Sequence, residues 1–179
     1  MASMNGISIN SLRSFKTEEG IAWQGEIYLA DKKIGEWSND SYGGPDSFQM
    51  EEGYSFEKLK KELCRFYPEW GNSPEEFFMY ELMKLTNRET IYKNRLAEYS
   101  CDVLLVVTDR SIEMDVGLPG YSGLTDQIIL LKEKDYINEL KEKLRPEDGH
   151  VKHQALIYRN LEQFSVGEEI DLVDIMQDI

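Results

Sequence analysis

Histidine and cysteine are scarce in this chain of 179 residues, which contains two of each. Cys64 falls in a helical pattern and Cys101 opens a strand pattern, so their spacing matches neither a metal-binding nor a redox motif. We expect two buried free thiols in a reducing cytoplasm rather than a disulfide. His150 and His153 lie in a turn-rich stretch without a nearby cysteine, which favours surface histidines over a metal site. The sequence therefore predicts no metal and no cofactor, and it limits acid–base schemes that depend on imidazole.

Long apolar runs are also missing. The longest run, residues 103–107, has the length of a buried strand and not the roughly 20 residues that a helix needs to cross a bilayer. The N-terminal residues lack the basic and then apolar pattern of a secretory signal. We therefore expect a cytoplasmic protein that does not contact membranes.

Basic residues are few in two segments of this acidic chain, whose net charge is −14. Residues 18–57 contain ten acids and two bases, which gives −8, and residues 160–179 contain six acids and no base, which gives −6. The rest of the chain is balanced. Because negative charge repels phosphate backbones and attracts basic surfaces, direct nucleic-acid binding is disfavoured and a basic protein partner is favoured. A second explanation of the same charge is solubility without any specific partner.

The hydrophobic periodicity predicts an α+β fold. Strict alternation over residues 21–30 indicates a half-buried strand, and strands at 7–15, 34–38 and 47–50 would complete an N-terminal antiparallel β-meander. This β-rich region covers residues 4–54.

A helical middle region, residues 55–100, follows. Ser55 is a candidate N-cap for a first helix that Pro68 stops, and Ser73 with Pro74 begins a second. We expect this second helix to break near residues 86–87 and a third helix to follow it.

The last region, residues 101–179, has a βαβ-like pattern. It consists of a central strand at 101–108, a strand at 128–131, an amphipathic helix around residues 137–144 and a strand at 154–158. We expect the C-terminal acidic segment to be a solvated end with a short helix, whose apolar stripe comprises Ile170, Val173 and Met176. The three regions form one compact unit or two small domains.

Carboxylates flank the predicted central strand, and they are the candidates for catalysis. Asp102, Asp109, Glu113 and Asp115 could hold Mg²⁺ in a metal-dependent nuclease or hydrolase that acts on nucleic acid or nucleotides. Nucleases of the restriction type also need an acid followed two residues later by lysine on the next strand, and Asp135 occupies that position after Glu133. The chain does not match this nuclease motif, so metal-dependent hydrolysis is the alternative hypothesis for its function and not the leading one.

Residues 15–48 carry a recognisable pattern: two acids before a strand, then D-x-K-x-x-G in a hairpin, then N-D-x-x-G-G. The matching residues are Glu18, Glu19, Asp31, Lys33, Gly35, Asn39, Asp40, Gly43 and Gly44. This stretch resembles small proteins of phages, plasmids and integrative elements of Gram-positive bacteria. The chain also looks similar in size and charge to some type II anti-CRISPR proteins. The physical interpretation is simpler, because the glycines suit tight backbone geometry and Asn39 and Asp40 suit a turn.

We therefore expect an interaction protein and not an enzyme. The resemblance implies a mobile-element setting, in which acidic accessory proteins are often inhibitors of host defence. Together with the acidic segment and the missing catalytic motif, it leads us to expect an inhibitor of a host defence enzyme, such as the RNA-guided nuclease of a type II CRISPR system. The acidic N-terminal face would bind the basic surface on which that enzyme holds nucleic acid. The candidate partner-binding residues are Glu18, Glu19, Asp40, Asp46, Glu51 and Glu52. The sequence leaves the oligomeric state open, including a homodimer or scaffold.

Overall fold

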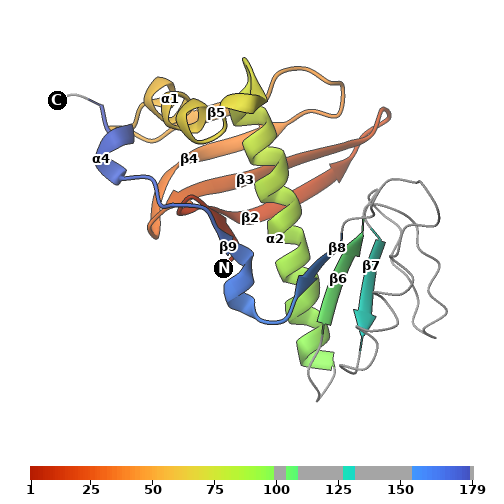
Figure 1. Cartoon of the computed structure of the whole chain (residues 1–179). Helices are drawn as coiled ribbons and strands as arrows, with labels where there is room; N and C mark the ends of the chain where they lie inside the picture. The colour runs from red at the N-terminus through yellow and green to blue at the C-terminus, as the bar shows by residue number, and fades with distance from the viewer. Residues whose placement is uncertain (99–103, 109–126, 132–154, 178–179) are drawn as a thin grey trace, which may run out of the picture. The chain divides into compact units, whose positions relative to one another are not determined.

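The computed structural model describes residues 1–98, 104–108, 127–131 and 155–177 of the chain. The fold is α+β, as the sequence predicts (Figure 1). The chain divides into two compact units, Met1–Glu89 with Phe164–Ile179, and Thr90–Gln163. Within the described residues, no helix has the length and the apolar character that spanning a membrane requires.

An N-terminal sheet dominates the first unit. Its strands are β1 (Ser3–Met4), β2 (Ile7–Lys16), β3 (Ile21–Leu29), β4 (Lys32–Asn39), β5 (Ser47–Met50) and β9 (Ser165–Val166). They lie in the order β5-β4-β3-β2-β1-β9, and the first five pair antiparallel as the predicted meander does. Only β9, which pairs with β1, runs parallel to its neighbour.

Two irregularities shape the meander. The β3–β4 turn is made by Ala30 and Asp31, both at positive φ, which is the two-residue turn that matches the twist of a hairpin. The register shifts at residues 11–12 of β2 and again at Ile34 of β4, so both strands carry β-bulges. A Cβ on Gly25 would come within 2.4 Å of Ile9 Cγ2. This close approach explains why a glycine occupies the position of β3 that pairs with the bulge of β2.

Helices follow strand β5 in the first unit. Helix α1 (Phe56–Phe66) begins at the predicted N-cap, where the Ser55 hydroxyl accepts a hydrogen bond from the Lys58 amide at 3.3 Å. A short 3₁₀ helix, η1 (Pro68–Trp70), follows it. Cys64 is exposed, so the expectation of a buried thiol is wrong at this position.

The predicted break in the second helix is wrong, because helix α2 (Pro74–Glu98) is continuous. It continues through Thr86 and Asn87, and the residues expected to form a third helix belong to it. The Thr86 hydroxyl donates to the Leu82 carbonyl at 2.8 Å, so this side chain is satisfied inside the helix and does not compete with it. Both units contain part of α2.

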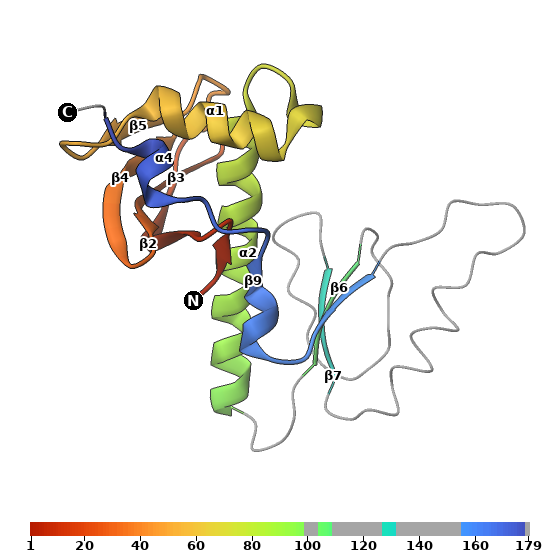
Figure 2. The same cartoon turned by 60° about the vertical axis from the view of Figure 1, so that its left-hand side comes forward.

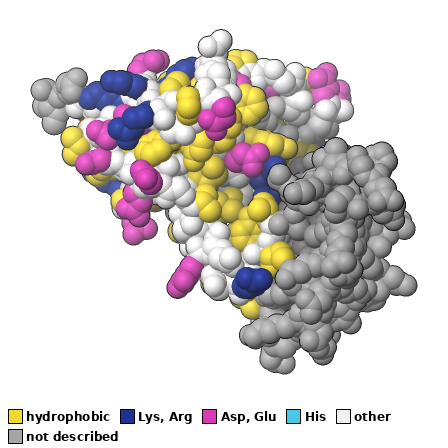
Figure 3. All heavy atoms as spheres, viewed as in Figure 1, with side chains coloured by type: hydrophobic (Ala, Val, Ile, Leu, Met, Phe, Trp, Pro, Cys, Tyr) yellow, Lys and Arg dark blue, Asp and Glu magenta, His cyan; other side chains and the backbone are white. Residues whose placement is uncertain are grey.

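The core of the first unit lies between the sheet and the helices. Figure 2 shows α2 against one face of the sheet, and the strands contribute buried aliphatic side chains to that face. The buried strand residues include Ile7, Ile9, Ile27, Leu29 and Ile34, and the buried helix residues include Leu59, Leu63, Phe78, Met79 and Leu82. On the face seen in Figure 3, hydrophobic side chains gather over α2. Phe77 and Tyr80 of α2 are about half exposed.

The second unit contains a sheet of β6 (Leu104–Thr108), β7 (Gln127–Leu131) and β8 (Ala155–Tyr158) in the order β7-β6-β8. The sequence therefore places the central strand correctly. Both pairings are antiparallel, so β7 and β8 run parallel to each other on either side of β6. The helix predicted around residues 137–144 lies outside the described residues. The Tyr92 hydroxyl of α2 donates to the Arg159 carbonyl at 2.8 Å within this unit.

The C-terminal segment is not a solvated end. After 3₁₀ helix η2 (Leu161–Phe164), its residues return to the first unit, and Phe164, Ile170 and Ile175 are almost fully buried. The predicted short helix exists as α4 (Leu172–Ile175), but the predicted stripe is wrong, because Val173 is 69% exposed. The four-residue helix buries Ile175 instead.

Candidate interaction surface on the N-terminal sheet

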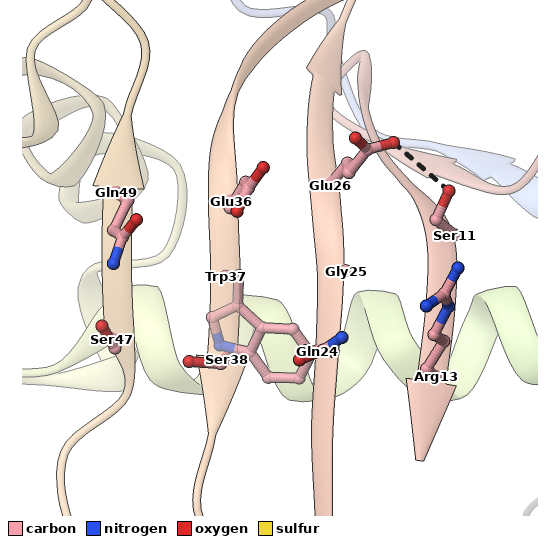
Figure 4. A pocket seen from close by; sticks show the side chains of 10 residues that line it. All are labelled: Ser11, Arg13, Gln24, Gly25, Glu26, Glu36, Trp37, Ser38, Ser47 and Gln49. Atoms are coloured by element: carbon pink, nitrogen blue, oxygen red, sulfur yellow. Dashed lines mark hydrogen bonds between the residues drawn. The ribbon is translucent and has the colours of Figure 1, made fainter.

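The face of the sheet that points away from α2 is polar. Because side chains alternate along a strand, the residues between the core positions of β2 to β5 gather on this outer face. One cross-strand row joins Glu26, Glu36 and Gln49, and the next joins Gln24, Ser38 and Ser47. Figure 4 shows these rows side by side, with α2 behind the strands.

A hollow of about 400 Å³ lies on this face. Its lining residues are Ser11, Arg13, Gln24, Gly25, Glu26, Glu36, Trp37, Ser38, Ser47 and Gln49. The bulge in β2 contributes to the lining, because Ser11 adopts a positive φ and its hydroxyl donates to Glu26 Oε2 at 3.2 Å. Hydroxyls, amides, two carboxylates and one guanidinium therefore surround the hollow, and this set suits hydrogen bonding to a polar or charged partner.

One lysine sits among three carboxylates beside the hollow. Lys33 Nζ lies 3.0 Å from Glu26 Oε1, 2.7 Å from Glu36 Oε1 and 3.5 Å from Glu51 Oε1. Its hydrogen bonds to Glu36 and then Glu26 raise the pKa of Lys33, and its hydrogen bond to Glu26 lowers the pKa of that carboxyl. Glu26 and Glu36 face each other across adjacent strands, an arrangement that is unfavourable for like charges unless a cation bridges them. The four groups together carry two negative charges.

The sequence identified acidic residues at both ends of the sheet, and the structure does not bring all of them together. Glu18 and Glu19 are exposed in the β2–β3 turn, which Thr17 and Gly20 close by hydrogen bonds. The Thr17 hydroxyl also hydrogen-bonds to the Ser41 hydroxyl, so this turn lies beside the loop between β4 and β5.

Asp40 and Asp46 belong to that same loop, where their carboxylates bind the protein itself. Asp40 Oδ1 accepts from the amides of Tyr42 and Gly44, both at 3.1 Å, which confirms that Asp40 orders the turn. Asp46 accepts from the indole nitrogen of buried Trp37 at 2.7 Å and from the side-chain Nδ2 of Asn39 at 2.8 Å. These bonds restrain the two side chains before any partner arrives.

Glu51 and Glu52 lie at the opposite end of the sheet. The Glu51 amide donates to the Ile34 carbonyl at 2.9 Å, next to the end of β4 that carries Lys33. Glu52 is exposed in the turn after β5. The six candidate residues thus form one group at the β2–β3 turn and its neighbouring loop, and a second group near Lys33.

Most of the quoted sequence pattern maintains backbone geometry. Asp31 occupies the hairpin turn at positive φ, and a Cβ on Gly35 would meet the Gln49 carbonyl oxygen of β5 at 2.7 Å. A Cβ on Gly44 would meet Asp40 Oδ2 at 2.9 Å. The glycines therefore serve tight geometry, as the sequence predicts, and Lys33 is the position with an electrostatic role.

The residues proposed for metal-dependent catalysis, Asp102, Asp109, Glu113 and Asp115, lie outside the described residues, as do both histidines. Among the residues that are described, no cluster of histidine, cysteine, aspartate or glutamate could hold a metal ion.

The grouping of Glu26, Glu36 and Gln49 was not predicted from the sequence. The alternation pattern did place Gln24 and Glu26 on one face, but the pairing with β4 and β5 depends on the two bulges. Comparison of the chain with protein-family models, curated proteins and solved structures finds no match.

Proposed function

We propose that the chain is an interaction protein of a mobile element that inhibits a host defence enzyme by covering its basic, nucleic-acid-binding surface. The RNA-guided nuclease of a type II CRISPR system is the target class that we propose. The observation that carries this proposal is the excess of carboxylates over cations around the N-terminal sheet.

This excess is not neutralised within the part of the chain that the structure describes. Lys33 is shared by three carboxylates, and the exposed side chains of Glu18, Glu19 and Glu52 have no ion pair among the described residues. Lys32, the second base of residues 18–57, lies over the Tyr54 ring at 5.5 Å. The outer face of the sheet and its two ends therefore attract cations.

A partner that binds nucleic acid presents the complementary charge. Its lysines and arginines are arranged to neutralise phosphates, and the carboxylates of this chain offer the same sign of charge on a folded surface. Occupation of that surface would exclude the nucleic acid by direct competition. Electrostatic steering would also make the association fast at low salt and slower at high salt.

Competition with DNA tests the proposal directly. A purified type II nuclease loaded with guide RNA is mixed with fluorescent target duplex, and the anisotropy of the duplex is followed as the chain is added. We expect the duplex to be displaced at 50 mM salt and the apparent affinity to fall about tenfold or more at 200 mM.

Charge reversal locates the surface. We expect Glu18→Lys with Glu19→Lys to weaken competition several-fold, because four units of charge change in an exposed turn. Glu162→Lys with Glu168→Lys is the matched control, since both residues are exposed, belong to neither β2 to β5 nor their turns, and change the net charge equally. Equal competition by both variants would remove the acidic-face mechanism. Absence of competition at low salt would remove the nuclease as the target.

A further inference from the structure

Strand β5 is the terminal strand of the N-terminal sheet, and one of its two edges pairs with β4. The Glu51 amide points to β4, where it donates to the Ile34 carbonyl, and the Gln49 carbonyl also faces Gly35 of β4. Because hydrogen-bonding groups alternate in direction along an antiparallel strand, those of Phe48 and Met50 point away from β4. Within the described residues, neither of these amides has a hydrogen-bond acceptor.

The free edges of β-sheets are normally protected against pairing with another strand, and the unpaired edge of β2 is an example in this sheet. The outer edge of β2 beyond its single pair with β1 carries a bulge at residues 11–12 and two basic residues, Arg13 and Lys16. Bulges and inserted charges are the usual devices that prevent another strand from docking. Strand β5, with the sequence Ser-Phe-Gln-Met, contains neither, and its protection is limited to its short length of four residues.

The residues that flank β5 determine what can pair with it. Asp46 precedes the strand, and Glu51 and Glu52 follow it. If a second copy paired antiparallel through its own β5, with Phe48 opposite Met50, Asp46 of each copy would lie opposite Glu52 of the other, and parallel pairing would align identical carboxylates. Like charges directly opposite on paired strands are unfavourable, so a second copy is a poor occupant. A segment with basic flanks is a good one.

We propose that β5 accepts an extended segment of the basic partner as an additional antiparallel strand, in which an uncharged centre of the length of β5 is flanked by lysine or arginine. This inference rests on the proposed function and specifies the mode of binding. The partner's backbone would pair with Phe48 and Met50, and its flanking cations would lie beside Asp46, Glu51 and Glu52. Pairing of this kind gives affinity through the main chain and specificity through alternate side chains.

The alternation of side chains along β5 determines where the partner's added strand should carry polar and apolar residues. One face of the added strand would extend the polar rows that end in Ser47 and Gln49 and line the hollow. The other face would lie beside Phe48, whose ring packs at 4.8 Å from that of Phe56, and beside Met50. We therefore expect polar and apolar residues to alternate. A strand as short as β5 pairs weakly by itself, so the charged flanks are needed for measurable binding.

A synthetic peptide tests whether β5 accepts an additional strand. The probe is Lys-Lys-Thr-Val-Thr-Val-Lys-Lys, added to the full ¹⁵N-labelled chain at low salt. We expect the amide resonances of Phe48 and Met50 to shift and their hydrogen exchange to slow on binding. The same peptide with glutamates in place of the lysines is the control, and it should produce no shift. Exchange rates at Phe48 and Met50 that do not change while the lysine peptide binds would overturn the proposal.

A pair of variants tests the same edge in the competition assay. Met50→Pro removes an amide that points outward, a position where an edge strand tolerates proline, and Met50→Ala removes the same side chain but keeps the amide. We expect Met50→Pro to lose about tenfold in competition, and Met50→Ala to stay within about twofold of the unchanged chain. Circular dichroism confirms that both are folded.

The outcomes separate the two proposals. If the unchanged chain displaces DNA and Met50→Pro does so equally well, the edge is not used, but the acidic-surface function stands. If the unchanged chain displaces nothing, the proposed function fails, and the peptide titration still tests the edge. If light scattering shows a dimer that Met50→Pro dissociates, β5 pairs with a second copy and the basic-partner proposal is overturned.

Discussion

A carboxylate of an acidic protein can hold the fold as well as attract a partner, and Asp46 holds the fold. It accepts from the Trp37 indole at 2.7 Å and from the Asn39 side-chain Nδ2 at 2.8 Å, so it connects the loop before β5 to β4. Trp37 is 3% exposed, and a buried donor of this kind is normally satisfied by a protein acceptor, which Asp46 provides. Asp46 therefore sets the position of the strand whose edge we propose as the docking site.

Replacement of Asp46 tests this assignment. We expect Asp46→Ala to lower the free energy of unfolding by about 1–3 kcal/mol, because it leaves a buried donor without an acceptor. Asp46→Asn is the comparison variant. It keeps one acceptor oxygen for Trp37 but sets an NH2 group against the Asn39 side chain, so it should recover only part of the loss. Urea denaturation followed by tryptophan fluorescence measures both. A loss of less than about 0.5 kcal/mol for Asp46→Ala would show that Asp46 does not stabilise the fold.

The residue scale also shows which contacts a sequence can predict. Asp40 and the amides that it binds, Tyr42 and Gly44, lie within four residues, and such local turn chemistry is readable from sequence. The contact between Asp46 and Trp37 requires the pairing of β4 with β5, and Lys33 reaches three carboxylates on three elements. Side-chain contacts of this second kind depend on register, which the alternation pattern does not specify.

At the scale of elements, α2 is the clearest difference from the sequence-based expectation. Threonine and asparagine are weak helix formers, and two of them in succession at Thr86 and Asn87 predicted a break. Thr86 is buried, its hydroxyl is bonded to the Leu82 carbonyl, and buried residues on both sides of the pair keep the helix packed. Tertiary packing outweighs a local preference of a few tenths of a kcal/mol per residue.

Proline at position 87 distinguishes a continuous helix from a broken one. In a continuous α2, Asn87→Pro deletes a hydrogen bond in the helix interior and should destabilise the protein by about 3 kcal/mol or more. Asn87→Ala should be neutral or stabilise it by about 0.5 kcal/mol, because alanine is the better helix former. Thermal denaturation followed by circular dichroism compares the two. Equal stability of both variants would restore the break that the sequence predicted.

The strands of the first unit were predicted more successfully than the surface that they build. Alternation of apolar and polar residues located β2, β3 and β5 to within about one residue of their observed ends. The hollow escaped prediction because the bulges at residues 11–12 and at Ile34 change which side chains share a row. A one-residue shift moves a side chain to the other face of a sheet, so the polar rows exist only with the observed register.

At the scale of the whole chain, the two ends of the sequence belong to one unit. Asn5 joins them: its amide donates to the Val166 carbonyl at 2.8 Å, its carbonyl accepts from Ile170 at 2.9 Å, and its side chain donates to the Glu168 carbonyl at 2.7 Å. The Tyr67 hydroxyl hydrogen-bonds to the same side chain, and burial raises the pKa of that hydroxyl. The acidic C-terminal segment thus completes the fold that presents the N-terminal sheet.

Helix α4 provides a direct test of whether the C-terminal segment stabilises the first unit, because two of its four residues differ sharply in burial. Ile175 is 0% exposed, and its carbonyl accepts from the Ser55 amide at the start of α1, whereas Val173 is 69% exposed. We expect Ile175→Ala to lower the free energy of unfolding by about 2–5 kcal/mol through the cavity that it leaves. Val173→Ala should change it by no more than about 0.5 kcal/mol. Urea denaturation measures both, and equal effects would mean that the acidic segment is a solvated end and that the first unit folds without it.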